Sequence, residues 1–106
     1  MRDYDEDAEL THYVLRAGSH LVTELEFRVR RVILFWAKGH GRLLGPDEEV
    51  EEALREGTAA FERRLRDRLL TEHGHEIFIN RCPSCRRIVR TPRARLCLWC
   101  GHDWHP

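Results

Sequence analysis

The sequence predicts an α+β fold, in which an antiparallel helical hairpin at residues 1–75 is followed by a small β-structured module at residues 76–106. Three observations lead to this prediction. Apolar residues recur every three or four positions through much of segment 1–75, the charge changes sign near residue 80, and all four cysteines lie beyond that point. A chain of 106 residues is long enough for one small domain with an appended module.

The charge is divided between the two parts. The chain contains 18 basic and 18 acidic side chains, a formal net charge of zero. Segment 81–106 carries a formal charge of +5 and segment 1–80 carries −5. The balanced total excludes a wholly basic nucleic-acid binder, although a local basic surface remains open.

The first helix is expected over residues 10–36. Its apolar stripe has the period of an α-helix and consists of Leu10, Val14, Ala17, Leu21, Leu25, Val29, Val32 and Trp36. Gly18-Ser19 interrupts this stripe and is expected either to kink the helix or to split it in two. Gly39-His40-Gly41 is expected to end the helix.

The second helix is expected to begin at Pro46-Asp47 and to end at His73-Gly74. Its stripe runs from Val50 to Leu69. Two long helices joined by a short connection would pair as an antiparallel hairpin.

The first helix also carries apolar residues outside its stripe. A two-helix hairpin cannot bury this second face, which includes Phe27, Leu34 and Phe35. Three partners could cover this face: the chain's own cysteine module, a second copy of the chain, or a different protein. We therefore expect a protein partner or a homodimer through the helices.

The strongest pattern in the chain is a pair of C-x2-C segments, Cys82–Cys85 and Cys97–Cys100, with segment 86–96 between them. Two such turns facing each other present four thiolates at the corners of a tetrahedron, which suits one structural Zn²⁺. Residues 76–80 alternate like a strand, and segment 86–96 has room for a tight hairpin that turns at 91–94.

These residues resemble the zinc-ribbon class, small β-structured modules built on two cysteine knuckles. The resemblance covers segment 76–106. Gly101 follows the second knuckle, as this class favours, whereas Arg86 stands at the matching place in the first. The whole chain resembles small bacterial proteins that join a helical region to such a ribbon, a resemblance that implies no activity.

Other uses of the cysteines are less favoured by the sequence. Rubredoxin iron sites share these knuckles, but the short separation favours zinc. A thioredoxin-like pair needs a βαβ context, and disulfides need an oxidising compartment. A zinc-linked redox switch stays open. His102 and His105 lie close enough in sequence to replace a cysteine or to support the site from outside.

The sequence does not indicate an enzyme. Four thiolates leave a zinc ion no open position, and the chain has no Gly-rich phosphate loop, nucleophile motif or paired carboxylates. No apolar run approaches the roughly 18 residues that span a bilayer, and the acidic start of the chain lacks the apolar core of a secretory signal. We expect a cytoplasmic protein without a membrane partner.

The expected function is that of a non-catalytic zinc-binding adaptor, with the helical arm used for protein contact or dimerisation. The alternative is a nucleic-acid-binding zinc-ribbon protein of transcription or translation, because arginines beside aromatic residues suit phosphate contact and base stacking. The residues expected to contact a partner are Arg86, Arg87, Arg90, Arg93, Arg95, Trp99 and Trp104.

Overall fold

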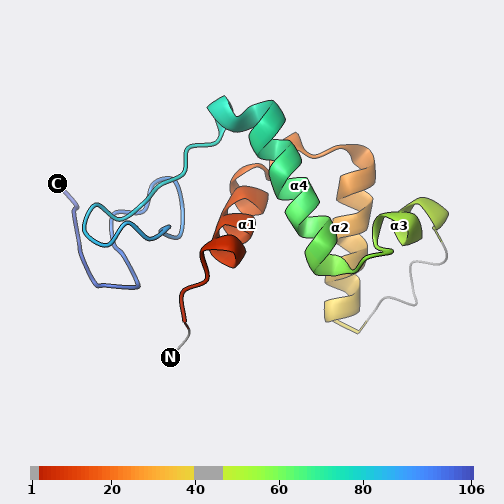
Figure 1. Ribbon diagram of the computed structural model, residues 1–106, viewed down its shortest axis with the longest axis horizontal. Coiled ribbons are helices and arrows are strands. Elements are labelled where there is room, and N and C mark those ends of the chain that lie inside the picture. Colours follow the sequence, from red (N-terminus) through yellow and green to blue (C-terminus); the bar gives the residue numbers. More distant parts are fainter. Residues whose placement is uncertain (1–2, 40–46) are drawn as a thin grey trace.

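The computed structural model describes residues 3–39 and 47–106. Its helices, in chain order, are α1 (Glu6–Ala17), the 3₁₀ turn η1 (Ser19–Leu21), α2 (Glu24–Ala37), α3 (Glu48–Ala53), α4 (Thr58–His73) and the 3₁₀ turn η3 (Gly74–Glu76). The molecule is elongated, measuring 50 × 32 × 22 Å. The cysteine module lies at one end, next to α1, and α2 and α3 lie towards the other end (Figure 1).

The first predicted helix is split into α1 and α2. Gly18 caps the end of α1, and a Cβ at this position would lie only 3.0 Å from the carbonyl oxygen of Val14. A new helix starts at Thr23, whose hydroxyl accepts a hydrogen bond from the N–H of Glu26, while the Glu26 carboxylate accepts one from the N–H of Thr23. This reciprocal cap satisfies two donors at the start of α2 and fixes the break.

The second predicted helix is also split, and the expectation of one continuous helix is wrong. Asp47 caps the start of α3 as expected, with its carboxylate accepting from the N–H of Val50; Pro46 lies outside the described residues. The chain then turns at Leu54, and α4 begins after Gly57, which has a φ of 97°. This left-handed backbone favours glycine and does not continue a helix.

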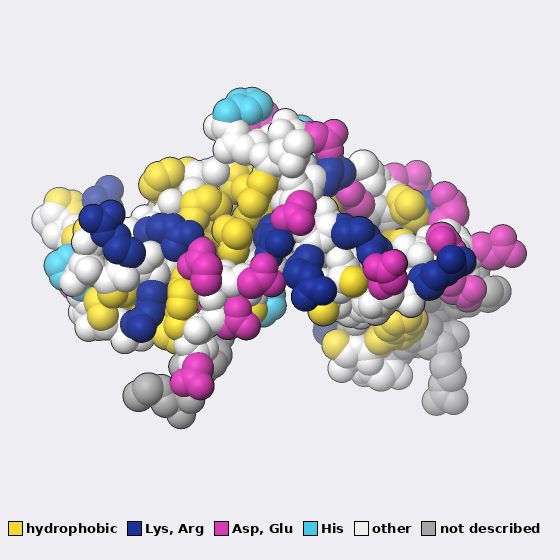
Figure 2. Space-filling view, in the orientation of Figure 1, with side chains coloured by type: hydrophobic (Ala, Val, Ile, Leu, Met, Phe, Trp, Pro, Cys, Tyr) yellow, Lys and Arg dark blue, Asp and Glu magenta, His cyan; other side chains and the backbone are white. Residues whose placement is uncertain are grey.

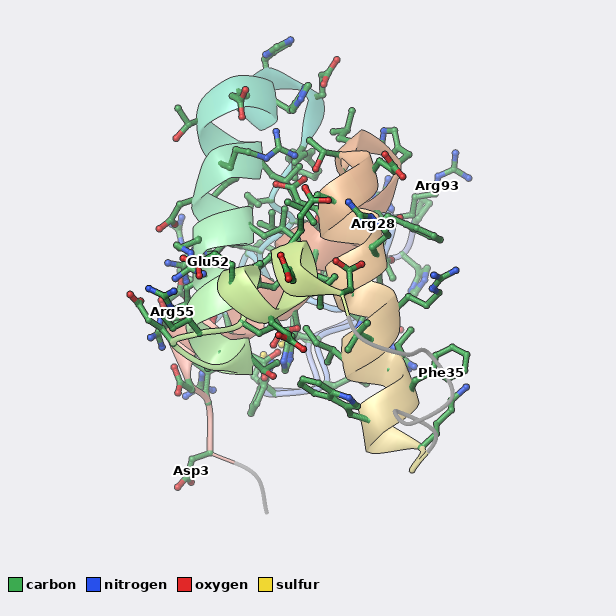
Figure 3. All side chains as sticks on the ribbon, turned by 90° about the vertical axis from the view of Figure 1, so that its right-hand side faces the viewer. Asp3, Arg28, Phe35, Glu52, Arg55 and Arg93 are labelled. Atoms are coloured by element: carbon green, nitrogen blue, oxygen red, sulfur yellow. The ribbon has the colours of Figure 1, made fainter. Side chains whose placement is uncertain are left out.

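The helices do not form a simple hairpin of two long helices. Instead, α1 packs against α4, and α2 packs against α3. Leu15, Leu65 and Leu69 are fully buried where α1 meets α4. Arg28 joins α2 to α3, with its guanidinium 2.9 Å from Asp47 and 3.0 Å from Glu49 (Figure 3).

The expected α+β fold is contradicted, because no β-strand occurs among residues 3–39 and 47–106. Glu76, the expected start of a strand, ends η3, and the expected hairpin over 86–96 does not form. Only two isolated antiparallel bridges are present in the described module, joining Arg81 to Ile88 and Leu96 to Asp103. Each bridge closes one cysteine turn upon itself, so the backbone groups that would build a ladder are used within the turns. The described fold is helical, with an irregular cysteine module.

The second apolar face of α2 is not covered by the cysteine module. Phe27 and Leu34 are each 58% exposed, although the rest of the helix is anchored by the buried Val29. Among the described residues, no helix is both long and apolar enough to cross a bilayer.

Candidate metal centre

The first cysteine turn is built by short-range backbone hydrogen bonds. The N–H of Cys82 donates to the carbonyl of Arg87, and the N–H of Arg86 donates to the carbonyl of Cys82, both at 2.9 Å. The N–H groups of Ser84 and Cys85 point at the Cys82 sulfur, at 3.3 and 3.4 Å. Charge-assisted donors of this kind favour the thiolate, the form that binds metal.

The second turn repeats the first at a later point in the chain. The N–H of Cys97 donates to the carbonyl of His102, and the N–H of Gly101 donates to the carbonyl of Cys97, again at 2.9 Å. The flanking bonds match as well, since Val89 donates to Asn80 in the first unit and Trp104 donates to Arg95 in the second. Segments 80–89 and 95–104 therefore form two copies of one unit.

The backbone conformation confirms this equivalence. Gly101 has a φ of 80°, and Arg86, at the matching position of the first unit, has a φ of 68°. Arg86 is the one described residue other than glycine with a positive φ. The first unit thus adopts the glycine conformation without the glycine.

The two turns bring the four sulfurs together. The Sγ atoms of Cys82 and Cys100 lie 3.6 Å apart, as do those of Cys85 and Cys97, and all four lie within 4.8 Å of one another. A tetrahedral zinc site with Zn–S bonds of about 2.3 Å has sulfur–sulfur edges of about 3.8 Å. The four cysteines are therefore close enough to hold one metal ion.

The electrostatics of the four thiols also point to a cation. Burial opposes ionisation of Cys82, but the N–H groups of Cys85 and Ser84 and the neighbouring thiols of Cys100 and Cys85 together lower the pKa of this thiol to about 6. The N–H of His102 lowers the pKa of Cys100, whereas desolvation and the neighbouring thiols raise it, with a net pKa of about 11. Four thiols so close together cannot all be ionised unless a cation compensates their negative charges.

The four cysteines differ in how deeply they are buried. Cys82 and Cys97, the first cysteine of each unit, are fully buried. Cys85 is half-buried and Cys100 is exposed. Val89, Trp99 and Trp104 pack around this cluster, which forms a small core separate from that of the helices.

The two histidines left open as substitute ligands or outer supports, His102 and His105, lie outside the cluster. Among the described residues, the group able to hold a metal consists of the four cysteines alone. The His102 ring stacks on Trp104 at 5.7 Å, and His105 Nδ1 lies 2.6 Å from the carboxylate of Asp103.

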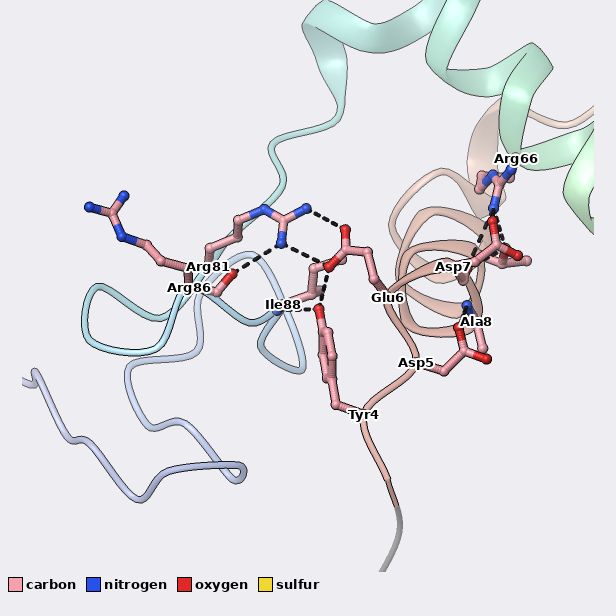
Figure 4. Close-up of polar contacts among 10 residues, drawn as sticks. Tyr4, Asp5, Glu6, Asp7, Ala8, Arg66, Arg81, Arg86 and Ile88 are labelled. Carbon is pink, nitrogen blue, oxygen red and sulfur yellow. Dashed lines mark hydrogen bonds and ion pairs between the residues drawn. The ribbon is translucent and has the colours of Figure 1, made fainter.

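The cysteine module is attached to the start of the chain by contacts that the sequence analysis missed. The Tyr4 hydroxyl accepts from the N–H of Ile88 and donates to Glu6, and the Glu6 carboxylate binds the Arg81 guanidinium through two contacts of 3.1 and 2.6 Å (Figure 4). Burial and the bond to Glu6 raise the pKa of Tyr4, which keeps the phenol protonated as a donor. The opposite charges of the two parts were the available signal for this docking.

A second set of contacts lies further along α1. The buried Tyr13 hydroxyl donates to the carbonyl of Phe78 and accepts from the N–H of Asn80 at 3.1 Å. Arg16 donates to the carbonyl of Arg90 at 2.9 Å. Because these bonds go to backbone groups of the module, no side-chain pattern in the sequence could have revealed them.

The residues expected to contact a partner fall into two groups. Both tryptophans are half-buried: Trp104 packs beside the sulfurs, and Trp99 also meets the Tyr4 ring edge-on at 4.9 Å. The second group consists of exposed arginines, namely Arg86, Arg87, Arg90, Arg93 and Arg95. Figure 2 shows basic side chains gathered over the module, with acidic side chains next to them on the neighbouring segment.

Comparison with known proteins adds no relative. No family model, no curated protein and no solved structure matches this chain.

Proposed function

We propose that the protein is a non-catalytic adaptor whose C-terminal module is folded around one structural Zn²⁺, held by Cys82, Cys85, Cys97 and Cys100. The observation that carries this proposal is the approach of all four sulfurs to within 4.8 Å of one another. The matched hydrogen bonds of the two units support it, since each unit delivers one buried and one more accessible sulfur to the same point.

The donor set favours zinc in a structural role. Four thiolates are soft ligands in a tetrahedral arrangement, and they fill the coordination shell of Zn²⁺. A closed shell leaves no place for a substrate or an activated water. The ion then acts on folding, because its binding free energy stabilises a module that has no β-ladder of its own.

Native mass spectrometry and a thiol assay test the metal centre on the purified, reduced protein. We expect one zinc per chain and no reactive thiol, with Cys82→Ser and Cys100→Ser each losing the metal. Ser84→Ala, an exposed change in the same turn, is the matched control and should keep it. A metal-free protein that is fully ordered beyond residue 80 would contradict the proposal. Visible absorption from thiolate-to-iron charge transfer would show that the bound metal is iron and not zinc.

The adaptor role rests on the uncovered face of α2. Phe27 and Leu34 are separated by two helical turns, so they share one side of the helix, and each is 58% exposed. Apolar side chains exposed along one side of a helix offer a surface for a protein partner. Light scattering of the wild type and of Phe27→Ser/Leu34→Ser over a range of concentrations distinguishes self-association, which the double variant should weaken, from contact with a different protein.

A further inference from the structure

The cysteine module carries an open groove on the side formed by Phe78 and Trp104. We call this hollow the Phe78–Trp104 groove, and its volume of about 590 Å³ falls within the range typical of ligand sites. It is lined by Phe78, Asn80, Pro92, Arg93, Ala94, Arg95 and Trp104. The groove does not include the metal ligands.

One wall of the groove is held in place by Asn80. Its side-chain amide donates to the carbonyls of Thr91 and Ala94, at 3.0 and 2.9 Å, and lies 3.4 Å from that of Pro92. Asn80 is itself 9% exposed, and its N–H is bound by Tyr13. The loop that carries Arg93 is therefore fixed before any ligand arrives, which lowers the cost of binding.

Arg81 of the module is paired with Glu6, whereas the two arginines that line the groove, Arg93 and Arg95, have no acidic partner among the described residues. In the helices, Arg28, Arg66 and Arg68 each contact at least one carboxylate within 4.0 Å. Within the part of the chain that the structure describes, no carboxylate pairs with the exposed side chains of Arg93 or Arg95, and the groove lining contains no acid. In Figure 3 the Arg93 side chain projects away from the body of the molecule. The groove is thus a positively charged hollow open to solvent.

Aromatic surface accompanies this charge. The Phe78 side chain is 65% exposed, although its carbonyl is held by Tyr13 and its neighbour Ile77 is buried in the helical core. Exposing a phenyl ring costs free energy unless a partner covers it. Trp104 also lines the groove, and it packs against the cysteine cluster.

We propose that the Phe78–Trp104 groove binds single-stranded nucleic acid, with a base stacked on Phe78 and backbone phosphates held by Arg93 and Arg95. This inference rests on the proposed function, because the module must be folded to form the groove. Base stacking on aromatic rings, combined with guanidinium contacts to phosphate, is the chemistry by which single strands are held with little sequence preference.

Two features favour a single strand over a duplex or an acidic peptide. A duplex is read by an element that enters its major groove or grips its backbone on both sides. The module is irregular and offers a hollow instead of a protruding helix. A purely acidic peptide such as polyglutamate can pair with the guanidinium groups but has no ring to stack on Phe78, whereas every nucleotide carries both a phosphate and a base.

Fluorescence anisotropy with labelled ten-nucleotide dT and U strands tests the inference on the full-length, zinc-loaded protein. We expect Phe78→Ala to weaken binding about tenfold or more, the loss typical of one stacked base. Arg93→Ala/Arg95→Ala should weaken it and reduce the slope of log K against log salt by about 1.4, because about 0.7 counterion is released per phosphate on single strands. A duplex of the same length and a polyglutamate peptide of matching length are run beside the single strands.

Matched variants separate the groove from general charge and apolar surface. Leu98→Ala removes a side chain that is 70% exposed on the same module but does not line this groove. Arg31→Ala/Arg63→Ala removes two exposed arginines from the helices. Both should bind like the wild type, and circular dichroism should show every variant folded.

Zinc content is measured on the same samples, so that the two proposals fail separately. A protein with one zinc that does not bind either strand overturns this inference alone. Equal binding of the duplex or of polyglutamate overturns it in favour of that ligand, and equal losses in the control variants overturn the assignment to the groove. A sample without zinc and without an ordered module contradicts both proposals together.

Discussion

At the scale of single residues, the clearest strain in the described chain lies at Arg86. It repeats the left-handed conformation of Gly101, with a φ of 68° against 80°. A side chain in this conformation costs roughly 1–2 kcal/mol, whereas glycine loses about 0.5–1 kcal/mol through its freer unfolded chain. We therefore expect Arg86→Gly to stabilise the module by about 0.5–1 kcal/mol. Thermal unfolding of the zinc-loaded protein, followed by near-ultraviolet circular dichroism, measures the difference.

The opposite change at the equivalent position is the control. Gly101→Ala introduces a methyl group with no atom within 4 Å, so its effect comes from the backbone alone. It should destabilise the module by a similar amount, about 0.5–1 kcal/mol. If Arg86→Gly and Gly101→Ala shift the unfolding midpoint in the same direction, the two turns are not equivalent.

At the scale of elements, one ion pair joins the start of α2 to α4. The Arg68 guanidinium contacts both oxygens of Glu26 at 2.6 Å and also donates to the carbonyl of Leu21. Burial raises the pKa of Glu26, but the bonds from Arg68 and from the N–H of Thr23 outweigh it, so the net pKa lies below 4.5. The pair therefore stabilises the fold above about pH 4.5, and this contribution is lost as the pH falls through the lowered pKa.

We accordingly expect Glu26→Gln to lower the free energy of unfolding by about 1–3 kcal/mol at pH 7, because it removes a charged partner from a partly buried guanidinium. The difference from wild type should shrink below pH 4. Urea unfolding between pH 3 and pH 7 measures both effects. Glu24→Gln, in the same helical turn but 87% exposed at the side chain, should have little effect at any pH. A difference that persists unchanged at pH 3 would contradict the role of the charge.

The helix boundaries and the predicted strand show how much of the fold could be predicted from the sequence. Gly18 and Asp47 mark helix boundaries through local chemistry, capping and close packing, and these positions were predicted. The apolar stripe predicts helix across residues 54–57 because its spacing continues over the break, and the spacing of apolar residues does not reveal the positive φ of Gly57. The alternating side-chain pattern of residues 76–80 predicts a strand, but a strand needs a second strand to pair with. The cysteine turns do not provide one, because their backbone N–H and C=O groups bond within each turn. The spacing of the cysteines predicts that they converge. It does not predict that the cysteine module docks onto Tyr4 and Tyr13.

At the scale of the whole molecule, the cysteine module and the helices are separate cores joined through α1. Ile77 and Ile88 are buried in the helical core, although Ile88 lies between the two cysteine pairs. Within residues 3–39, hydrogen bonds and ion pairs to the module come from Tyr4, Glu6, Tyr13 and Arg16. Loss of the metal should therefore be felt along α1 and not only beyond residue 80.

Hydrogen exchange of Cys82→Ser tests this coupling. In the proposed metal centre, removing one ligand would release the ion and the free energy with which it folds the module, so amide protection should fall by about two orders of magnitude or more within residues 80–104. Protection should also fall in α1, whose contacts with Asn80 and Ile88 depend on the folded module, while α2 and α3 should keep theirs because they pack on each other at the far end. Ser84→Ala should leave the pattern unchanged. Unaltered protection in α1 of the metal-free variant would show that the helices do not sense the module, and uniform loss through α2 and α3 would show that the molecule has a single cooperative core.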